Sequence, residues 1–396
     1  MNHAFRLAGV AATALGLTLA SGSAFAQSAI KIGFISTMSG PEGVLGQDLA
    51  DGFKLAMKHA GGNFGGRPVE VIYGDDQFKP DVGRQLADKM IESDKVQIVT
   101  GINFSNVLLA ALKPVLDSGA FYISTNAGPS ILAGKQCNPH FFAGAFQNDQ
   151  NYEGMGQYLK DKGYKKVYLM APNYPAGKDM LTGVKRYYKG DVSGEVYTAM
   201  GQLDYSAEIA QIRAAKPDAV LVFYPGGMGI NFVKQYAQAG LKEQIPLFAG
   251  AAVVDQTILP AVGEAAVGMY TGALWSEFLD NAANKRFTTD FEAEYKRIPS
   301  PYAALAYDTG RLMSAAGDQV GGKIEDKAAF QKALEAAKFD SVRGSFRFNT
   351  NHMPIQDYYL TRIEKDSKGR YVAALKEKIM TDLTDAYAGD CKMPAP

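Results

Sequence analysis

Few residues in the sequence have the types and spacing that catalysis requires. The 396-residue chain contains four histidines, His3, His59, His140 and His352, whose separations fit no zinc-ligand pattern. It contains no Gly-x-Ser-x-Gly motif around a nucleophilic serine, no Gly-Lys-Ser/Thr phosphate loop and no His-Glu-x-x-His motif. We therefore expect no enzyme and no bound metal or cofactor, and we keep a secreted hydrolase as the weakest alternative.

Two turns between a strand and a helix could instead bind a polar ligand. Gly40, Gly43 and Gly46 follow an apolar strand, but their spacing is not the Gly-x-Gly-x-x-Gly of dinucleotide loops. We interpret this segment as a turn at the edge of a cleft. The segment 103–106 (NFSN) precedes an apolar helix, and Ser105 is placed to cap that helix and to offer a hydroxyl to an anion.

The elements that would position these turns alternate regularly. A continuous apolar strand at residues 30–36 is followed by a helical pattern at 46–60, and the alternation continues to residue 124. After a polar break at 147–151 (QNDQN), the same alternation restarts and runs to residue 274. This rhythm is typical of parallel sheets covered by helices on both faces. Two rounds of it predict an α/β protein with two doubly wound lobes.

The first 26 residues have the features of a cleaved signal peptide. Arg6 precedes an apolar run at residues 7–20, and Ala24-Phe25-Ala26 gives the small-x-small pattern of a cleavage site after Ala26. The run is shorter than the roughly 20 residues that span a bilayer. We therefore expect an exported protein, whose remaining chain of about 370 residues is long enough for two domains.

Charge and cysteine content narrow the function further. The formal net charge is zero, which argues against a nucleic-acid partner, because such proteins need a basic face. The only cysteines are Cys137 and Cys391. An even number of cysteines in an exported protein favours a disulfide between them.

Five segments, taken in order, resemble the type I periplasmic binding proteins, in particular the leucine/isoleucine/valine-binding branch. They are IGFISTMSGPEGVLGQDLADGF (32–53), YISTNAGP (122–129), FQNDQN (146–151), NYPAG (173–177) and YAALAYDTG (302–310). The resemblance implies two lobes joined by a three-strand hinge, a ligand cleft between them, and docking of the closed form on the permease of an ABC transporter in the membrane. It also implies residence in the periplasm, and we expect a monomer.

The same resemblance implies the division of the chain. We expect residues 27–146 and 275–348 in the N-terminal lobe. Residues 147–274, with the tail at 349–396, should form the C-terminal lobe.

The resemblance also implies where a ligand would bind. Relatives that bind branched-chain amino acids hold the ligand carboxylate at the helix start that matches Ser105. They hold the ammonium group with an acidic residue at the position that we align with Ala252, and Asp255 lies about one helical turn away. A threonine of these relatives aligns with Gly128. The carboxylate half of an amino-acid site is therefore expected, and the ammonium half is missing.

Other residues expected at the cleft are polar turn residues and aromatic residues at strand ends. The polar ones are Ser39 and Asn126, with Lys178 as a candidate charge partner; the aromatic ones are Phe104, Tyr174, Tyr224, Trp275 and Tyr302. Each aromatic side chain could equally pack in a core. Together they predict a flat apolar pocket for a benzoate-like or hydroxycinnamate-like acid. The alternative is a branched-chain amino-acid receptor that uses Asp255.

Overall fold

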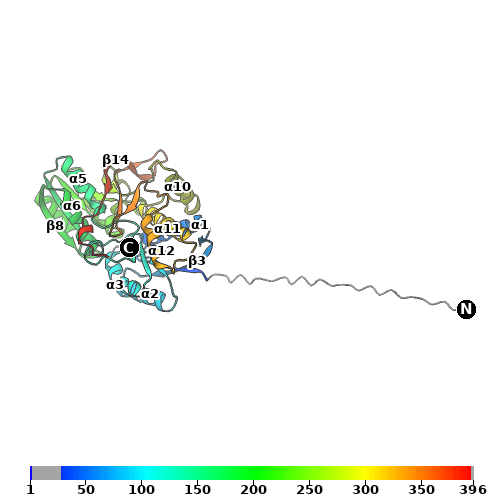
Figure 1. Ribbon diagram of the computed structural model, residues 1–396. Helices are drawn as coiled ribbons and strands as arrows, with labels where there is room; N and C mark the ends of the chain where they lie inside the picture. The colour runs from blue at the N-terminus through cyan, green and yellow to red at the C-terminus, as the bar shows by residue number, and fades with distance from the viewer. Residues whose placement is uncertain (2–27, 394–396) are drawn as a thin grey trace.

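The computed structural model describes residue 1 and residues 28–393 of the chain. Nearly all of the predicted signal peptide therefore lies outside the described residues. The described chain builds two sheets with helices around them, as Figure 1 shows, and this is the predicted α/β architecture. No helix within residues 28–393 is long and apolar enough to cross a membrane.

The first sheet has six strands in the order β2-β3-β1-β4-β5-β6, and all of its pairs except β2-β3 are parallel. Its strands are β1 (Ile30–Ser36), β2 (Asn63–Phe64), β3 (Arg67–Asp75), β4 (Ile98–Thr100), β5 (Phe121–Ser124) and β6 (Phe141–Ala143). The helices between them are α1 (Gly43–His59), α2 (Pro80–Glu92), α3 (Ser105–Asp117) and α4 (Ser130–Ala133). Because β1 is central and covered on both faces, its apolar residues run continuously instead of alternating with polar ones.

The second sheet follows the order β12-β13-β11-β10-β9-β7-β8, with β14 paired to β13. Its strands are β7 (Lys166–Pro172), β8 (Asp191–Thr198), β9 (Ala219–Val222), β10 (Leu247–Gly250), β11 (Tyr270–Ala273), β12 (Phe346–Phe348), β13 (Pro354–Lys365) and β14 (Tyr371–Leu383). Its helical segments are α5 (Gln150–Asp161), α6 (Pro175–Tyr187), α7 (Ser206–Ala215), α8 (Gly227–Gln238), η1 (Ala251–Val253), α9 (Leu259–Val262) and η2 (Gly263–Ala266). The strands β7 to β11 are parallel, and the late strand β13 is antiparallel to its neighbours.

After β11 the chain returns to the first lobe through α10 (Ala282–Tyr295), α11 (Pro301–Gln319) and α12 (Lys327–Ala336). In Figure 1 the yellow α11 lies beside the blue α1. The two helices approach closely at Gly52, where a Cβ atom would lie only 2.0 Å from the carbonyl oxygen of Ala303. Ser300 caps α11, because its hydroxyl accepts from the backbone N–H of Tyr302 at 3.1 Å.

The chain passes between the two sheets three times: after β6, after β11 and before β12. Strand β12 pairs with β13 of the second sheet, with Arg347 opposite Ile355. The expected end of the first lobe at residue 348 is therefore too late, since hydrogen bonding to β13 already assigns Phe346–Phe348 to the second sheet.

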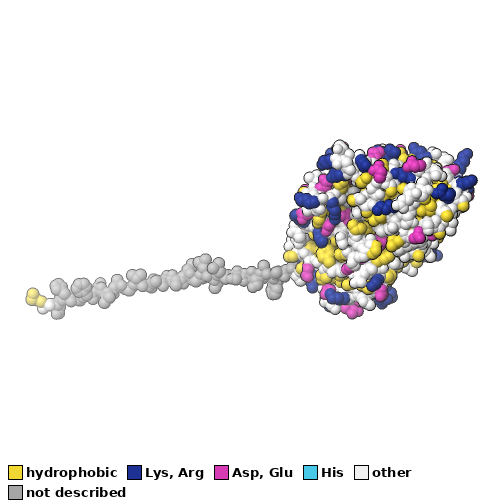
Figure 2. Space-filling model, turned by 180° about the vertical axis from the view of Figure 1, so that it is seen from behind, with side chains coloured by type: hydrophobic (Ala, Val, Ile, Leu, Met, Phe, Trp, Pro, Cys, Tyr) yellow, Lys and Arg dark blue, Asp and Glu magenta, His cyan; other side chains and the backbone are white. Residues whose placement is uncertain are grey.

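The predicted disulfide between Cys137 and Cys391 is formed, across a sequence separation of 254 residues. It fixes the tail that follows β14, including η3 (Ala388–Asp390), to the first lobe. The surface facing the viewer in Figure 2 carries basic and acidic side chains interspersed, in keeping with a formal net charge of zero.

Candidate functional site

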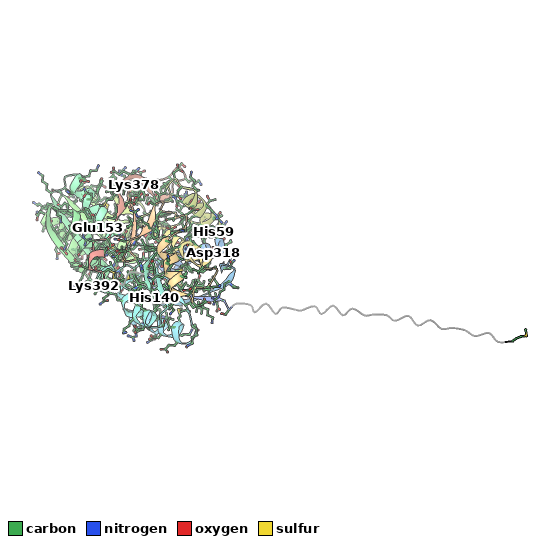
Figure 3. All side chains as sticks on the ribbon, viewed as in Figure 1. His59, His140, Glu153, Asp318, Lys378 and Lys392 are labelled. Atoms are coloured by element: carbon green, nitrogen blue, oxygen red, sulfur yellow. A yellow bond between two sulfur atoms is a disulfide. The ribbon has the colours of Figure 1, made fainter. Side chains whose placement is uncertain are left out.

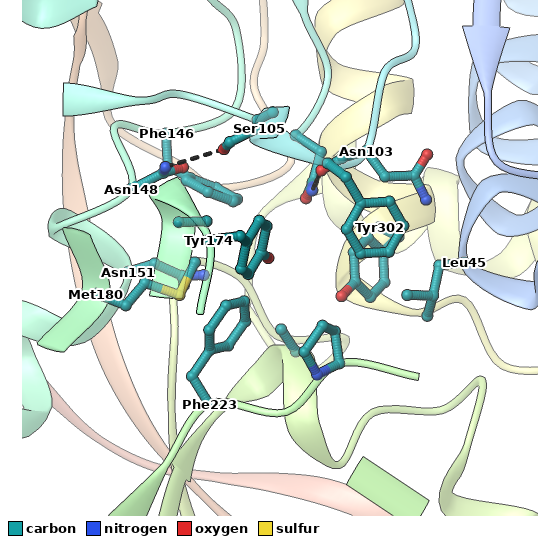
Figure 4. Close-up of a pocket in the computed structure, with 16 residues that line it drawn as sticks. Leu45, Asn103, Ser105, Phe146, Asn148, Asn151, Tyr174, Met180, Phe223 and Tyr302 are labelled. Atoms are coloured by element: carbon teal, nitrogen blue, oxygen red, sulfur yellow. Dashed lines mark hydrogen bonds between the residues drawn. The ribbon is translucent and has the colours of Figure 1, made fainter. Parts of the chain in front are cut away.

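A cavity lies between the two lobes, at the carboxyl ends of the parallel strands, where open α/β sheets bind ligands. The space left between its walls, including its mouth, is about 350 Å³. The first lobe and the first crossing provide, among others, Asn103, Phe104, Ser105, Asn126, Phe146 and Tyr302. The first crossing and the second lobe provide Asn148, Asn151, Tyr174, Met180, Phe223 and Ala252 (Figure 4).

One end of the cavity carries hydrogen-bond donors that are suited to an anion. The Oδ1 atom of Asn103 accepts from the hydroxyl of Ser36 and, at 3.4 Å, from the backbone N–H of Thr37. The Nδ2 atom of Asn103 is buried and has no partner among the described residues. Beside it is the start of α3, whose first N–H groups have no partner within the helix. A carboxylate placed here would meet both sets of donors.

Ser105 belongs to this end of the cavity but does not cap α3. It is the first residue of the helix, Phe104 takes the cap position, and no side chain caps the helix start. The hydroxyl of Ser105 instead accepts from Nδ2 of Asn148 at 3.1 Å, as the dashed line in Figure 4 marks. Its own proton remains available to a ligand.

Aromatic rings form the walls of the cavity. The ring centroids of Phe104 and Tyr174 are 6.4 Å apart, and those of Tyr174 and Phe223 are 6.1 Å apart with nearly parallel planes. Tyr302 lines the same cavity. Within the described chain, neither the Tyr174 nor the Tyr302 hydroxyl makes a hydrogen bond, and burial raises the pKa of both phenols. Such walls suit a planar ring that carries a polar group.

The two lobes are in contact next to the cavity. Asp179 of α6 accepts from both the backbone N–H and the hydroxyl of Ser130, at 3.0 and 2.7 Å, and burial raises the pKa of its carboxyl group. Asn148 donates to Asp179 at 2.9 Å as well as to Ser105. The described conformation is therefore a closed one, with polar contacts between the lobes.

A second contact between the lobes is made by Glu42, at the start of α1. Its carboxylate accepts from the backbone N–H of Gly227 at 3.2 Å, and burial raises its pKa to about 7. The neighbouring Gly226 has a φ of +59°, and a Cβ atom there would lie 1.7 Å from the Glu42 carboxylate. Glycine at this position leaves room for the Glu42 carboxylate beside the backbone of the second lobe.

Seven of the residues expected at the cleft line its cavities: Phe104, Ser105, Asn126, Tyr174, Ala252, Trp275 and Tyr302. The side-chain amide of Asn126 donates to the carbonyl oxygen of Asn103 at 2.7 Å, which holds the β4–α3 turn against the β5 loop. Trp275 lines a second cavity, behind Tyr302, and its indole N–H donates to Asn284 at 2.7 Å.

Four expected residues lie elsewhere. Ser39 is exposed in the turn before α1, and Lys178 is exposed on α6 and cannot act as the charge partner. Gly128 contacts the first crossing, where its N–H donates to Asn148 at 3.0 Å. Tyr224 packs in the second lobe, with its hydroxyl accepting from the hydroxyl of Thr198 at 3.1 Å.

The sequence interpretation missed several cavity residues. Phe223, not Tyr224, faces the cavity, because neighbouring residues at the end of β9 point to opposite sides. Asn103 was noticed only as part of a turn, and Asn148 and Asn151 only as part of a polar break. The dense polar content of the QNDQN segment could have signalled their role, since buried crossings need side-chain hydrogen bonds.

No lysine, arginine or histidine lines the cleft cavities within residues 28–393. In that range no cluster of three metal-ligating side chains occurs either. Figure 3 shows two of the histidines: His59 at the end of α1 and His140 before β6. His59 is tied to Tyr307 at 2.8 Å and to Asp290 at 3.1 Å. The first two cavities therefore present neutral polar groups and ring surfaces.

Comparisons with known proteins identify the family. A family profile described as "Periplasmic binding protein" matches residues 29–369. The Leu/Ile/Val-binding protein homolog 6 of Brucella melitensis is 29% identical over 377 residues, which cover 91% of this chain and 94% of the relative.

Two solved structures are similar throughout their length. A solute-binding protein of an ABC transporter from R. palustris, in complex with benzoate, has a TM-score of 0.87 and 31% identity, and the match covers 92% of this chain and all of the other. One from Rhodopseudomonas palustris BisB5, in complex with 3,4-dihydroxybenzoic acid, has a TM-score of 0.83 and 29% identity over 91% of this chain and 99% of the other. The chain belongs to the periplasmic binding protein family and is a type I solute-binding protein of ABC transporters.

Proposed function

We propose that this protein captures an aromatic carboxylic acid in the periplasm and delivers it to the permease of an ABC importer. The observation that carries the proposal is the unpartnered Nδ2 group of Asn103, buried in a cavity with aromatic walls. A buried donor without a partner is costly, and a ligand carboxylate would satisfy it. The helix start at Ser105 offers further donors to the same group.

The lining of the first two cavities supports an amine-free ligand. No acidic residue lines the first or the second cavity, and Ala252 occupies the position aligned with the ammonium-binding acid of relatives. An α-amino acid would carry its ammonium group into this space unpaired, which is unfavourable. The neighbours at 29% and 31% identity bind 3,4-dihydroxybenzoic acid and benzoate, chemistry that fits these walls.

A branched-chain amino acid is the second candidate, favoured by the names of the curated relatives and by the buried carboxyl group of Asp255. Calorimetry with benzoate, 4-hydroxybenzoate, 4-hydroxycinnamate and leucine decides between the two. We expect one or more aromatic acids to bind with micromolar or lower Kd, and leucine not to bind. If leucine binds with micromolar Kd and none of the aromatic acids binds, the protein is a branched-chain amino-acid receptor instead.

Replacement of Asn103 tests the site itself. In Asn103→Asp, one carboxylate oxygen can still accept from Ser36, while the other faces the ligand. We expect affinity for the aromatic acid to fall at least 100-fold, about 2.7 kcal/mol, because like charges then meet. Asn173→Asp, an exposed change near the same cleft, is the matched control and should leave Kd unchanged. Equal affinities of the two variants would remove Asn103 from the site.

A further inference from the structure

Two further cavities lie next to the first, and they share lining residues in turn. The second shares Asn126, Phe146, Asn151, Ala252 and Tyr302 with the first. The third shares Ala251, Trp275 and Pro301 with the second. Together they form a series that leads from the donors of Asn103, past the rings of Tyr302 and Trp275, to a third cavity with different chemistry.

The third cavity is lined by a buried acid with an unused oxygen. Asp255 is only 1% exposed. Its Oδ1 atom accepts from the backbone N–H and the hydroxyl of Thr257, at 2.7 and 2.6 Å. Its Oδ2 atom is buried and has no hydrogen-bond partner among the described residues. An unsatisfied buried carboxylate oxygen is unusual in folded proteins and calls for a partner that is absent here.

The surroundings of Asp255 are acidic, with no basic residue to pair it. Glu277 lines the same cavity and accepts from the Gln256 amide at 2.9 Å. Burial raises the pKa of Asp255 to about 7 and that of Glu277 to about 8. Asp48 lies near enough to add to the effect on Asp255, but Asp48 is itself paired with Arg297 at 2.7 Å. A ligand hydroxyl or amine could donate a hydrogen bond to the free Oδ2 atom of Asp255 in this cavity.

We propose that Asp255 forms a distal subsite, which selects aromatic acids that carry a hydrogen-bond donor, a hydroxyl or an amine, at the end opposite their carboxylate. Asp255 is close enough to the Tyr302 hydroxyl to influence it, so the subsite begins where the ring pocket ends. An α-amino acid has its two charged groups on one carbon. It cannot place one at Asn103 and the other beyond the Tyr302 ring, whereas a ring-spaced pair of groups can. This inference rests on the proposed function and specifies its ligand class.

Matched ligand pairs test the subsite in the full mature protein. Kd is measured by calorimetry for benzoate against 4-hydroxybenzoate and for cinnamate against 4-hydroxycinnamate, with the 4-amino acids as a second arm. In the wild type we expect at least tenfold tighter binding of the donor-bearing acid in one of the pairs. In Asp255→Asn, the amide oxygen can still accept from Thr257, but an N–H replaces the free oxygen. The preference should then fall to about one, while binding of the unsubstituted acid changes less than threefold.

The outcomes separate the subsite from the function as a whole. Asp255→Asn counts as folded if its unfolding midpoint is close to that of the wild type and its Kd for the unsubstituted acid is unchanged. Asp280→Asn, at an exposed acid, is the matched control and should keep the wild-type preference. A wild type without preference, or a preference that survives Asp255→Asn, overturns the subsite while the aromatic-acid function stands. Binding of leucine alone overturns both.

Discussion

The Nε atom of Arg343 donates to Oδ2 of Asp308 at 2.7 Å, and both side chains are almost fully buried where the chain crosses between the lobes for the third time. The other guanidinium donors reach the carbonyl oxygens of Gly144 and Ala145, at the first crossing, both at 2.7 Å. One side chain thus ties two of the three crossings together. The contacts of Arg343 therefore connect the crossings, and Asp308 provides the carboxylate that balances the buried positive charge of Arg343.

Asp308→Asn tests this dependence. The substitution leaves the Arg343 charge buried without an anionic partner, and we expect the free energy of unfolding to fall by about 3–5 kcal/mol. Urea unfolding measures it. The exposed pair of Arg347 and Asp382, at 2.7 Å, provides the control, since Asp382→Asn should change stability by less than about 1 kcal/mol. Equal losses in the two variants would contradict a special role for the buried pair.

The disulfide holds the tail between the lobes. Cys391 is bonded to Cys137 of the first lobe, while the Tyr387 hydroxyl donates to Asp149 at 2.7 Å and accepts from Arg186 of the second lobe at 3.1 Å. Replacing both cysteines with serine should lower the free energy of unfolding by up to about 5 kcal/mol, because the unfolded chain is then no longer restricted by a long covalent loop. Unfolded, unreduced wild type should show no thiol on labelling; two labelled thiols would contradict the bond.

The sequence was sufficient to predict elements whose burial pattern is local. The continuous apolar run of β1 was predicted with its observed bounds, because a central strand is apolar along its whole length. Strand β14 was missed, because much of its length is exposed and charged and only its pairing with β13 makes it a strand. Such tertiary pairing leaves little trace in local composition.

The site was harder to predict because it depends on which side chains of each helix and strand face the cavity. In helix α6, Lys178, which was expected as a charge partner, faces solvent, while the next residue, Asp179, bonds Ser130. One residue along a helix turns a side chain by about 100°, so spacing alone could not choose between them. The same uncertainty applies after β9, where Tyr224 was expected at the cavity but Phe223 lines it.

Removal of the Ser105 hydroxyl should weaken ligand binding more than folding. We expect Ser105→Ala to raise Kd for the aromatic acid about tenfold, through loss of a charge-assisted hydrogen bond, and stability to change by less than about 1 kcal/mol, since Ser105 caps nothing. Ser206 is likewise the first residue of its helix but is exposed, so Ser206→Ala is the matched control. Unchanged affinity in Ser105→Ala would leave this hydroxyl as a partner of Asn148 only.

Glu42 should make lobe closure depend on pH. In the closed form Glu42 is only 4% exposed and burial raises its pKa to about 7, whereas parting the lobes exposes the carboxyl group to water and returns the pKa towards the ordinary value near 4.5. Closure therefore takes up a proton between about pH 4.5 and 7. Below about pH 4.5 the Glu42 carboxyl group is already neutral in the open form, so closure buries no charge. As the pH rises from about 4.5 to 7, closure must either bury a carboxylate or take up a proton, and the affinity for the ligand declines. Above about pH 7 the affinity no longer changes with pH.

Calorimetric titrations with the aromatic acid from pH 5 to 8 measure the effect, which for one group is at most about tenfold per pH unit. Glu42→Gln keeps an acceptor for Gly227 but cannot ionise, so its affinity should vary less steeply between pH 5 and 7. The ligand's own carboxyl titrates identically in both proteins, and the buried Asp179 and Asp255 remain in both. Their shared contribution cancels in the difference between the two profiles. Superimposable profiles would show that Glu42 stays neutral, or stays buried, whether the lobes are open or closed.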